Sequence, residues 1–142
     1  MSSLLEQARA RARARRSRQI KIPVPDDPSL VLVCQVPTDG TTIERIKNAA
    51  SKADKGKAEG TNFARALVAE QCEQIIIGTE VQVRDDEEVN FRSPELWKEL
   101  EVFTAKDAVV ELIGSDGAIA SIAATLLEEG GFTDTEAQAD PI

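Results

Sequence analysis

The chain of 142 residues contains no histidine, the side chain best suited to proton transfer near neutral pH. This absence excludes the Ser–His and Cys–His pairs that activate a nucleophile, together with the common zinc sites. Phosphate-binding loops of the GxGxxG and GxxxxGK[ST] types are also missing. Four consecutive carboxylates at residues 85–88 lack the alternating ligands and central glycine of a calcium loop, so we expect a solvated turn there. We therefore expect a binding protein without cofactor or metal, and not an enzyme.

Aromatic residues and cysteines are scarce. With no Tyr, one Trp and four Phe, the core must be built from Val, Ile, Leu and Ala, and so thin a core makes self-association into homo-oligomers an expectation. Cys34 and Cys72 lie in apolar segments without CxxC spacing, which favours buried, reduced thiols but leaves a disulfide between them open. No apolar run approaches the roughly 20 residues that cross a bilayer. We expect a cytosolic protein without a membrane partner.

Charge is distributed unevenly along the chain. Residues 1–21 contain seven Lys or Arg and one Glu, a charge of +6, so residues 22–142 carry −14 of the total of −8. Arginines two positions apart point to opposite sides of a helix, so we expect residues 1–18 to be a flexible basic arm that orders only against a partner. The arm is a solubilising tail, a contact for nucleic-acid phosphates or a contact for an acidic protein surface. The arginines that would meet an anionic partner are Arg9, Arg11, Arg13, Arg15, Arg16 and Arg18.

Two segments alternate between apolar and polar residues, which predicts two short β-hairpins. The first hairpin covers residues 19–36 around a turn at residues 25–29, and Pro23 makes its first strand an edge strand because proline lacks an N–H donor. The second hairpin joins residues 80–84 to residues 88–92. Its buried side is expected to carry Val81, Val83, Val89 and Phe91.

Apolar residues at helical spacing predict about five helices. Thr41 and Glu44 match a capping box at the start of the first helix, whose buried face would carry Ile43, Ile46 and Ala50. Residues 62–77 form the second helix, ended by Gly78, after a mobile loop at residues 51–61. The later helices begin near Pro94, Thr104 and Ala118, and Phe132 folds back after Gly130–Gly131.

These elements predict an α+β fold with more helix than strand, in one domain spanning residues 19–132. The basic arm at residues 1–18 precedes this domain, and a disordered acidic tail at residues 133–142 follows it. The helix after Pro94 is too short to bury all of its apolar residues, which are therefore either core or a partner-binding patch. The candidate apolar partner-binding residues are Leu96, Trp97, Leu100, Phe103, Ile119, Ile122, Leu126 and Leu127.

The order of these elements resembles that of the tail assembly chaperones of long-tailed, siphovirus-type bacteriophages, especially those that infect actinobacteria. The resemblance covers about residues 19–132 and is a pattern of apolar positions and element order, without a catalytic signature. It is carried by the early hairpin with Leu30-Val-Leu-Val33, the segment Asn62-Phe-Ala-Arg-Ala-Leu-Val-Ala-Glu-Gln-Cys72, the β element at residues 81–91, and the segments at residues 105–113 and 119–127 that end in Gly-Gly-Phe132.

The resemblance implies a chaperone in the host cell cytoplasm that is absent from the mature virion. Such a protein binds the tape measure protein, keeps its apolar helices soluble, promotes assembly of the tail tube protein and self-associates. This chain would correspond to the short form of a pair whose longer member arises by ribosomal frameshifting. Two alternatives stay open: a small nucleic-acid-associated regulator that binds through the arginine arm, and a structural tail or head–tail component of the phage particle.

Overall fold

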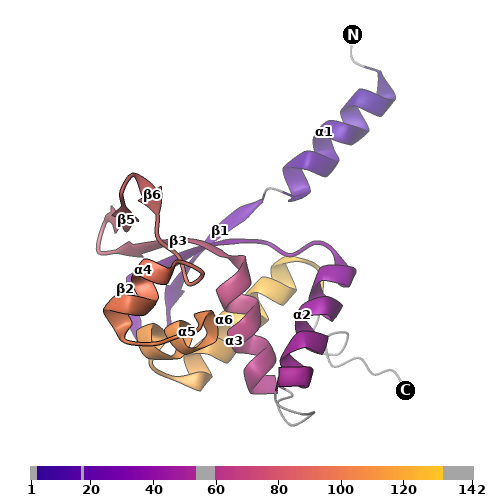
Figure 1. Ribbon diagram of the computed structural model, residues 1–142. Coiled ribbons are helices and arrows are strands. Elements are labelled where there is room, and N and C mark those ends of the chain that lie inside the picture. Colours follow the sequence, from indigo (N-terminus) through magenta and orange to yellow (C-terminus); the bar gives the residue numbers. More distant parts are fainter. Residues whose placement is uncertain (1–2, 17, 54–59, 133–142) are drawn as a thin grey trace.

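The computed structural model describes residues 3–16, 18–53 and 60–132, and its fold is α+β, as the sequence predicted (Figure 1). The described residues form six helices, one more than expected, and two antiparallel sheets of four and two strands. The expected tail at residues 133–142 lies outside the described residues.

The main sheet has the strand order β1-β2-β3-β4, with every neighbouring pair antiparallel. The first predicted hairpin is confirmed, since β1 pairs with β2 and Ile22 lies opposite Leu32. Strand β1 lies at the edge of the sheet, as predicted from Pro23. Proline has no N–H to donate, and an edge strand tolerates this because it has no further strand to bond on its outer side. The strands are β1 (Gln19–Val24), β2 (Asp27–Gln35), β3 (Cys72–Ile77) and β4 (Glu80–Val81).

Helices pack on this sheet and bury its apolar residues. Helix α3 contacts β2 and helix α6 contacts β1, while α2 and α5 pack against α3 (Figure 1). The centre of the core is aliphatic, as the composition required, and includes the fully buried Leu32, Leu67, Ile75 and Ile119. The helices of this layer are α2 (Gly40–Ala53), α3 (Gly60–Gln71), α5 (Ala105–Ile113) and α6 (Asp116–Glu129).

The prediction of one helix over residues 62–77 is wrong beyond Gln71. Helix α3 ends there, and residues 72–77 form β3. The β-branched residues Ile75, Ile76 and Ile77 pair with residues 30–32 of β2, so their backbone groups bond across the sheet instead of along a helix. Gly78 adopts a φ of +67° in the turn to β4 and does not end a helix.

The start of α2 also differs from the expectation. The side chain of Asp39 accepts a hydrogen bond from the backbone N–H of Thr41 at 2.9 Å, so Asp39 and not Thr41 satisfies the first turn. The predicted buried face of Ile43, Ile46 and Ala50 is confirmed. Residues 51–53 and 60–61 of the expected loop are helical, and residues 54–59 lie outside the described residues.

The second hairpin is smaller than predicted and less buried. Strands β5 (Val83–Arg84) and β6 (Glu87–Glu88) pair through Asp85 and Asp86, both of which have positive φ. Val89 and Phe91 are buried as expected, but Val81 and Val83 are 39% and 44% exposed. These strands have only two residues each and project beyond the main helical layer (Figure 1), and α4 borders the hairpin without burying Val83.

Local sequence signals locate the last three helices, although the Ser93 side chain makes no capping hydrogen bond to the first of them. Helix α4 (Pro94–Leu100) begins after Ser93, and the Thr104 side chain accepts from the N–H of Asp107 at the start of α5, as predicted. Ser115 caps α6 in the same way, so this helix begins two residues earlier than expected. After α6, the N–H of Phe132 donates to Leu127 O, and the Phe132 ring packs back on the core.

The N-terminal segment differs from the flexible arm that the sequence predicted. Residues Leu4–Arg16 form helix α1, which projects away from the body of the molecule (Figure 1). Ala and Arg are among the best helix formers, which accounts for this conformation in the absence of an apolar face. Arg18 then joins α1 to β1 and is held to the body by an ion pair with Glu129.

The close packing of Gly130 against the segment after β2 yields a test of the fold. A Cβ atom at Gly130 would lie 1.9 Å from Pro37 O, so we expect Gly130→Ala to lower the free energy of unfolding by about 1–3 kcal/mol. Gly117→Ala in α6 is the matched control, because its Cβ would meet only Ser115 Oγ at 3.6 Å. Urea unfolding measures both variants, and an equal effect would contradict the packing described here.

Candidate partner-binding surfaces

The eight apolar residues predicted to bind a partner divide between core and surface. Ile119, Ile122, Leu126 and Leu127 of α6 are at most 5% exposed, and Leu96 of α4 is 8% exposed. These five side chains belong to the hydrophobic core. In this structure they offer no surface to a partner.

The other three candidate residues are more accessible. Leu100 and Trp97 are partly buried against the core, and the Trp97 indole donates a hydrogen bond to Phe91 O at 2.6 Å. Phe103, in the link between α4 and α5, is 89% exposed. Phe103 is therefore the candidate residue that a partner can reach directly.

Three exposed apolar residues were missed by the sequence reasoning. Ile77 ends β3 and is 50% exposed, while Val81 and Val83 lie on the short strands that follow. Alternation had placed both valines on a buried face. The available signal was the shortness of the apolar segments between Gly78 and the acidic turn, which leaves little backbone for a covering element.

A groove lined mainly by alanine side chains lies between α2, α3 and the start of α5, and we call it the alanine groove. It encloses about 340 Å³. Phe103 precedes Ala105, a lining residue, by two positions. An ion pair between Arg45 of α2 and Glu70 of α3 joins the two helices. The lining residues are Ala49, Ala50, Ala66, Ala69, Glu70, Arg92, Ala105 and Lys106.

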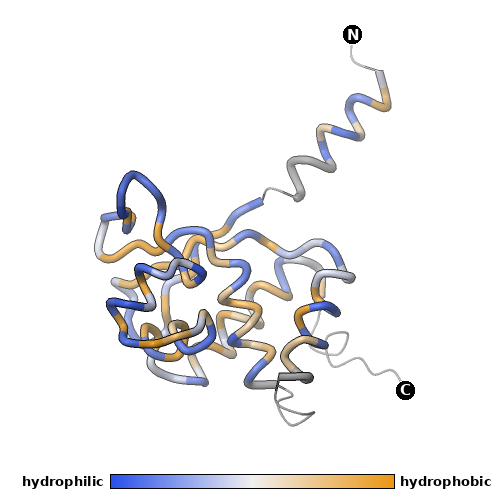
Figure 2. Tube along the Cα trace, viewed as in Figure 1, coloured by the Kyte–Doolittle hydropathy of each residue, from blue (hydrophilic) through white to orange (hydrophobic). Residues whose placement is uncertain are grey.

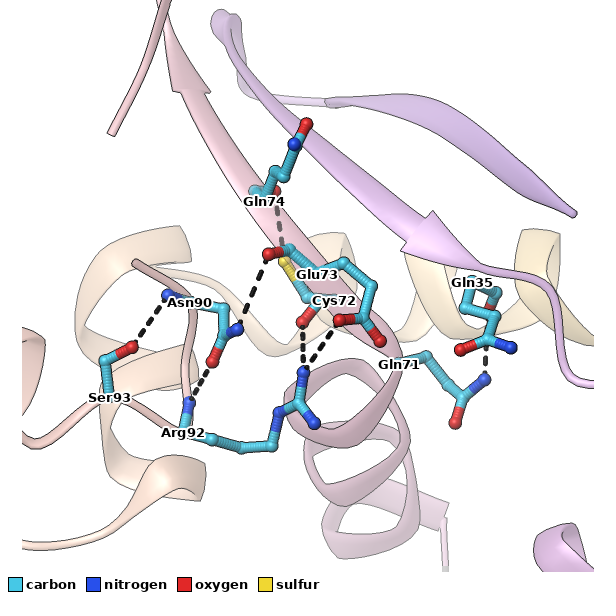
Figure 3. A network of polar contacts seen from close by, with 8 residues as sticks. All are labelled: Gln35, Gln71, Cys72, Glu73, Gln74, Asn90, Arg92 and Ser93. Carbon is cyan, nitrogen blue, oxygen red and sulfur yellow. Dashed lines mark hydrogen bonds and ion pairs between the residues drawn. The ribbon is translucent and has the colours of Figure 1, made fainter. Parts of the chain in front are cut away.

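Arg92 fixes one wall of the alanine groove through a polar network (Figure 3). Its Nη2 donates to Cys72 O at 3.1 Å and to Glu73 Oε2 at 3.3 Å, and its backbone N–H donates to Asn90 Oδ1 at 2.9 Å. The Asn90 amide in turn donates to Glu73 O at 3.4 Å. Charge-assisted bonds thus tie the segment before α4 to the point where α3 becomes β3.

The two cysteines are neighbours across the sheet. Cys34 of β2 lies opposite Cys72 of β3, and both thiols are free and fully buried, as the sequence favoured. A hydrogen bond with the Cys34 thiol and burial together raise the pKa of the Cys72 thiol well above its ordinary value. The thiolate of Cys72, which is its reactive form, is therefore suppressed, and Cys72 is unsuited to nucleophilic chemistry near neutral pH.

The six arginines of the predicted anionic-partner site are in different situations. Arg9 and Arg11 are exposed on α1, while Arg18 is engaged by the carboxylate and the carbonyl oxygen of Glu129. The side chains of Arg13, Arg15 and Arg16 lie outside the described residues, although their backbones are part of α1.

A second concave site, which we call the apolar hollow, lies beside the β5–β6 hairpin. It encloses about 140 Å³ and is lined by aliphatic side chains that include Ile77, Leu96 and Leu100. Glu95 and Glu99 of α4 also line it, and Glu99 forms an ion pair with Arg84 of β5. The hollow thus combines an apolar lining with the Glu95 carboxylate and the Arg84–Glu99 ion pair.

Neither a metal centre nor a membrane span was found in the part of the chain that the structure describes. No group of three or more Cys, Asp or Glu side chains there could hold a metal ion. No single described helix is long and apolar enough to cross a membrane; α5 and α6 reach that length and composition only as a pair, and the pair is bent by 111°.

Comparison with known proteins identified no relative. The chain matches no protein-family model, no curated protein and no solved structure.

The raised pKa of Cys72 predicts how stability depends on pH. The unfolded thiol loses its proton above a pH of about 8.5, whereas the native thiol keeps it, so the native state binds more protons there. We expect the free energy of unfolding of the wild-type protein to fall above this pH by up to about 1.4 kcal/mol per pH unit. This decrease is measured relative to the Cys72→Val variant, which lacks the thiol and supplies the baseline. Urea unfolding of both proteins from neutral to alkaline pH measures the difference, and identical pH profiles would contradict the assignment.

Proposed function

We propose that the protein is a phage tail assembly chaperone that binds apolar helices of the tape measure protein and keeps them soluble until the tail tube protein assembles around them. The observation that supports this proposal most directly is Phe103, one of only four phenylalanines, which is 89% exposed close in sequence to the alanine groove. The similarity in element order to tail assembly chaperones supplies the identity of the client.

The alanine groove suits a helical client. Its walls carry methyl groups from three helices, which allow another helix to approach closely in the helix-in-groove mode of recognition. Glu70, Arg92 and Lys106 are also among the lining residues. Glu70 and Arg92 are already paired with Arg45 and Glu73, and these ion pairs together with Lys106 give the groove a polar border for the polar flank of an amphipathic client.

Phe103 provides an aromatic anchor for such a client. An exposed aromatic ring on a protein with so few aromatics is costly unless something covers it, and partner-binding sites concentrate aromatic anchors. The link that carries Phe103 is short, since it joins Leu100 at the end of α4 to Ala105 at the start of α5, and the N–H of Val102 within it donates to Trp97 O at 2.9 Å. The ring can therefore bind a client without prior ordering of a loop.

The acidic body suits the same role. Residues 22–142 carry −14, which keeps a protein with exposed apolar side chains dispersed while it holds an aggregation-prone client. Binding of this kind requires no turnover and no cofactor.

Variants at the alanine groove and at Phe103 test the proposal. We expect Phe103→Ser to weaken binding of a tape measure helix peptide by tenfold or more, about 1.4 kcal/mol, through loss of apolar contact. Ala49→Phe should weaken binding to a similar extent by filling the groove from an exposed position on α2. Fluorescence anisotropy of the labelled peptide measures both, and co-expression with the tape measure protein reports client solubility.

Two controls separate binding from general damage. Ala120→Phe places the same bulk on an exposed position of α6 away from the groove residues, and Phe103→Leu keeps an apolar side chain. Both should bind the peptide nearly as well as the wild-type protein, and moderate salt should change the affinity little. A wild-type protein that leaves the client insoluble would overturn the proposal.

Arg9 and Arg11 are exposed on α1, and this favours a second candidate function, that of a small nucleic-acid-associated regulator. This function requires that affinity for duplex DNA fall steeply with salt and disappear when residues 1–18 are deleted. The third alternative, a structural tail or head–tail component, requires the protein to be present in purified virions.

A further inference from the structure

We infer that α1 of one copy of this protein docks on the acidic hairpin face of a second copy. We define that face as the β5–β6 hairpin, the exposed residues Ile77 and Val81 beside it, and the apolar hollow bordered by α4. This contact is independent of the client-binding role, because it uses neither Phe103 nor the alanine groove.

Helix α1 has the properties of a segment that needs a partner. It projects from the body (Figure 1), and a helix of 13 residues that is not packed on other elements is only marginally stable in water. At its start, Leu4 and Leu5 are 81% and 59% exposed, an unusual placement for two adjacent leucines. A partner that covers the leucines would also stabilise the helix.

Helix α1 carries apolar and positively charged residues on the same faces. Leu5 and Arg9 are four residues apart, and Leu4 and Arg11 are seven apart, so each leucine shares a helix face with an arginine. Leu4–Arg16 contains five arginines and one glutamate, a charge of +4. The matching surface must therefore offer an apolar depression next to negative charge.

The acidic hairpin face carries the complementary charge. Residues 80–101 contain eight Asp or Glu and three Lys or Arg, a charge of −5. Two of these cations are engaged, since Arg84 pairs with Glu99 and Arg92 pairs with Glu73. The ion pairs of these two arginines do not involve the turn carboxylates, and Figure 2 shows the β5–β6 hairpin as mainly hydrophilic. These exposed carboxylates are Asp85, Asp86, Glu87 and Glu88.

The apolar hollow provides the depression. Its volume of about 140 Å³ is close to that of cavities of roughly 150 Å³ that hold a small apolar molecule, so one leucine side chain fits it. Glu95 lines the same hollow, where it would meet an arginine that follows the leucine on α1. Glu99 also lines the hollow but is already paired with Arg84, another lining residue. Ile77 and Val81 extend the apolar surface beside it.

The attachment of α1 favours a second copy over the same molecule. Arg18 is fixed by Glu129 of α6, and its carbonyl oxygen accepts from the N–H of Val36, so α1 is attached to the body at the start of β1. Only Ser17 lies between this anchor and α1, which points away from the β5–β6 hairpin in Figure 1. The contact is therefore head to tail, and its repetition produces rings or open chains.

Charge reversal in the full chain tests the contact. Arg9→Glu with Arg11→Glu reverses α1, and Glu87→Lys with Glu88→Lys reverses the hairpin at strand positions, sparing the positive-φ residues Asp85 and Asp86. We expect the wild-type protein to gain mass with concentration at low salt, as measured by light scattering after size exclusion. Each reversed variant should associate at least tenfold more weakly, and the chain that carries all four substitutions should associate again.

Two further variants complete the test. Glu44→Lys with Glu111→Lys reverses two exposed carboxylates outside the acidic hairpin face and should leave the association intact. Leu4→Ser with Leu5→Ser should weaken association even at salt concentrations that screen the charges. All changed residues are exposed, and circular dichroism verifies that each variant is folded.

The inference fails if the wild-type protein is a monomer at every concentration and salt tested. It also fails if the reversed variants associate like the wild type, or if α1 reversal removes binding to duplex DNA without altering self-association. Loss of association together with retained binding of the tape measure peptide would support the contact while leaving the client-binding role unaffected.

Discussion

The pairing of β3 with β2 is the interaction on which the rest of the structure depends. It places Ile75, Ile76 and Ile77 against residues 30–32 and ends α3 at Gln71. Helix α3 packs against β2, and helices α2 and α5 pack against α3. The alanine groove lies where these three helices meet. The same pairing carries the chain to the far edge of the sheet, where β4 and the β5–β6 hairpin emerge. Both proposed binding surfaces thus follow from one long-range strand pairing and the Arg92 network that fixes its start.

Features specified by neighbouring residues could be predicted from the sequence. The first hairpin depends on a short turn between two consecutive strands, and the Thr104 cap and the return of Phe132 after Gly130–Gly131 depend on contacts within a few positions. The structure has all three. Strand β3 could not be predicted in this way, because residues 72–77 fit a helix locally and become a strand only through partners about 40 positions away. Asp39 replaced Thr41 as the cap for a related reason: two residues separated only by Gly40 could each fill the role, and the path of the chain after β2 decided between them.

The candidate surfaces show the same division. Phe103 was predicted because a short helix cannot bury every apolar neighbour, a local argument. The apolar stripe of α6 was also predicted as a partner surface, yet it is core, since periodicity shows that a face is apolar but not what covers it. The alanine groove could not be predicted, because its walls come from three helices whose packing is set by the sheet. Val81 and Val83 alternate correctly for burial but lie beyond the helical layer.

The two proposed surfaces differ in their physical character, and this difference allows them to act independently. The alanine groove and Phe103 offer mainly apolar contact, which salt affects little. The contact between α1 and the acidic hairpin face joins a segment of charge +4 to one of −5, both solvent-exposed, so it weakens as ionic strength rises. Copies linked through α1 would place several alanine grooves along one long client, and the linkage would raise the effective concentration of each groove without any change in its own affinity. If both proposals hold, a chain with a small aliphatic core would thereby obtain client-binding surface by repetition of the molecule and not by enlargement of the domain.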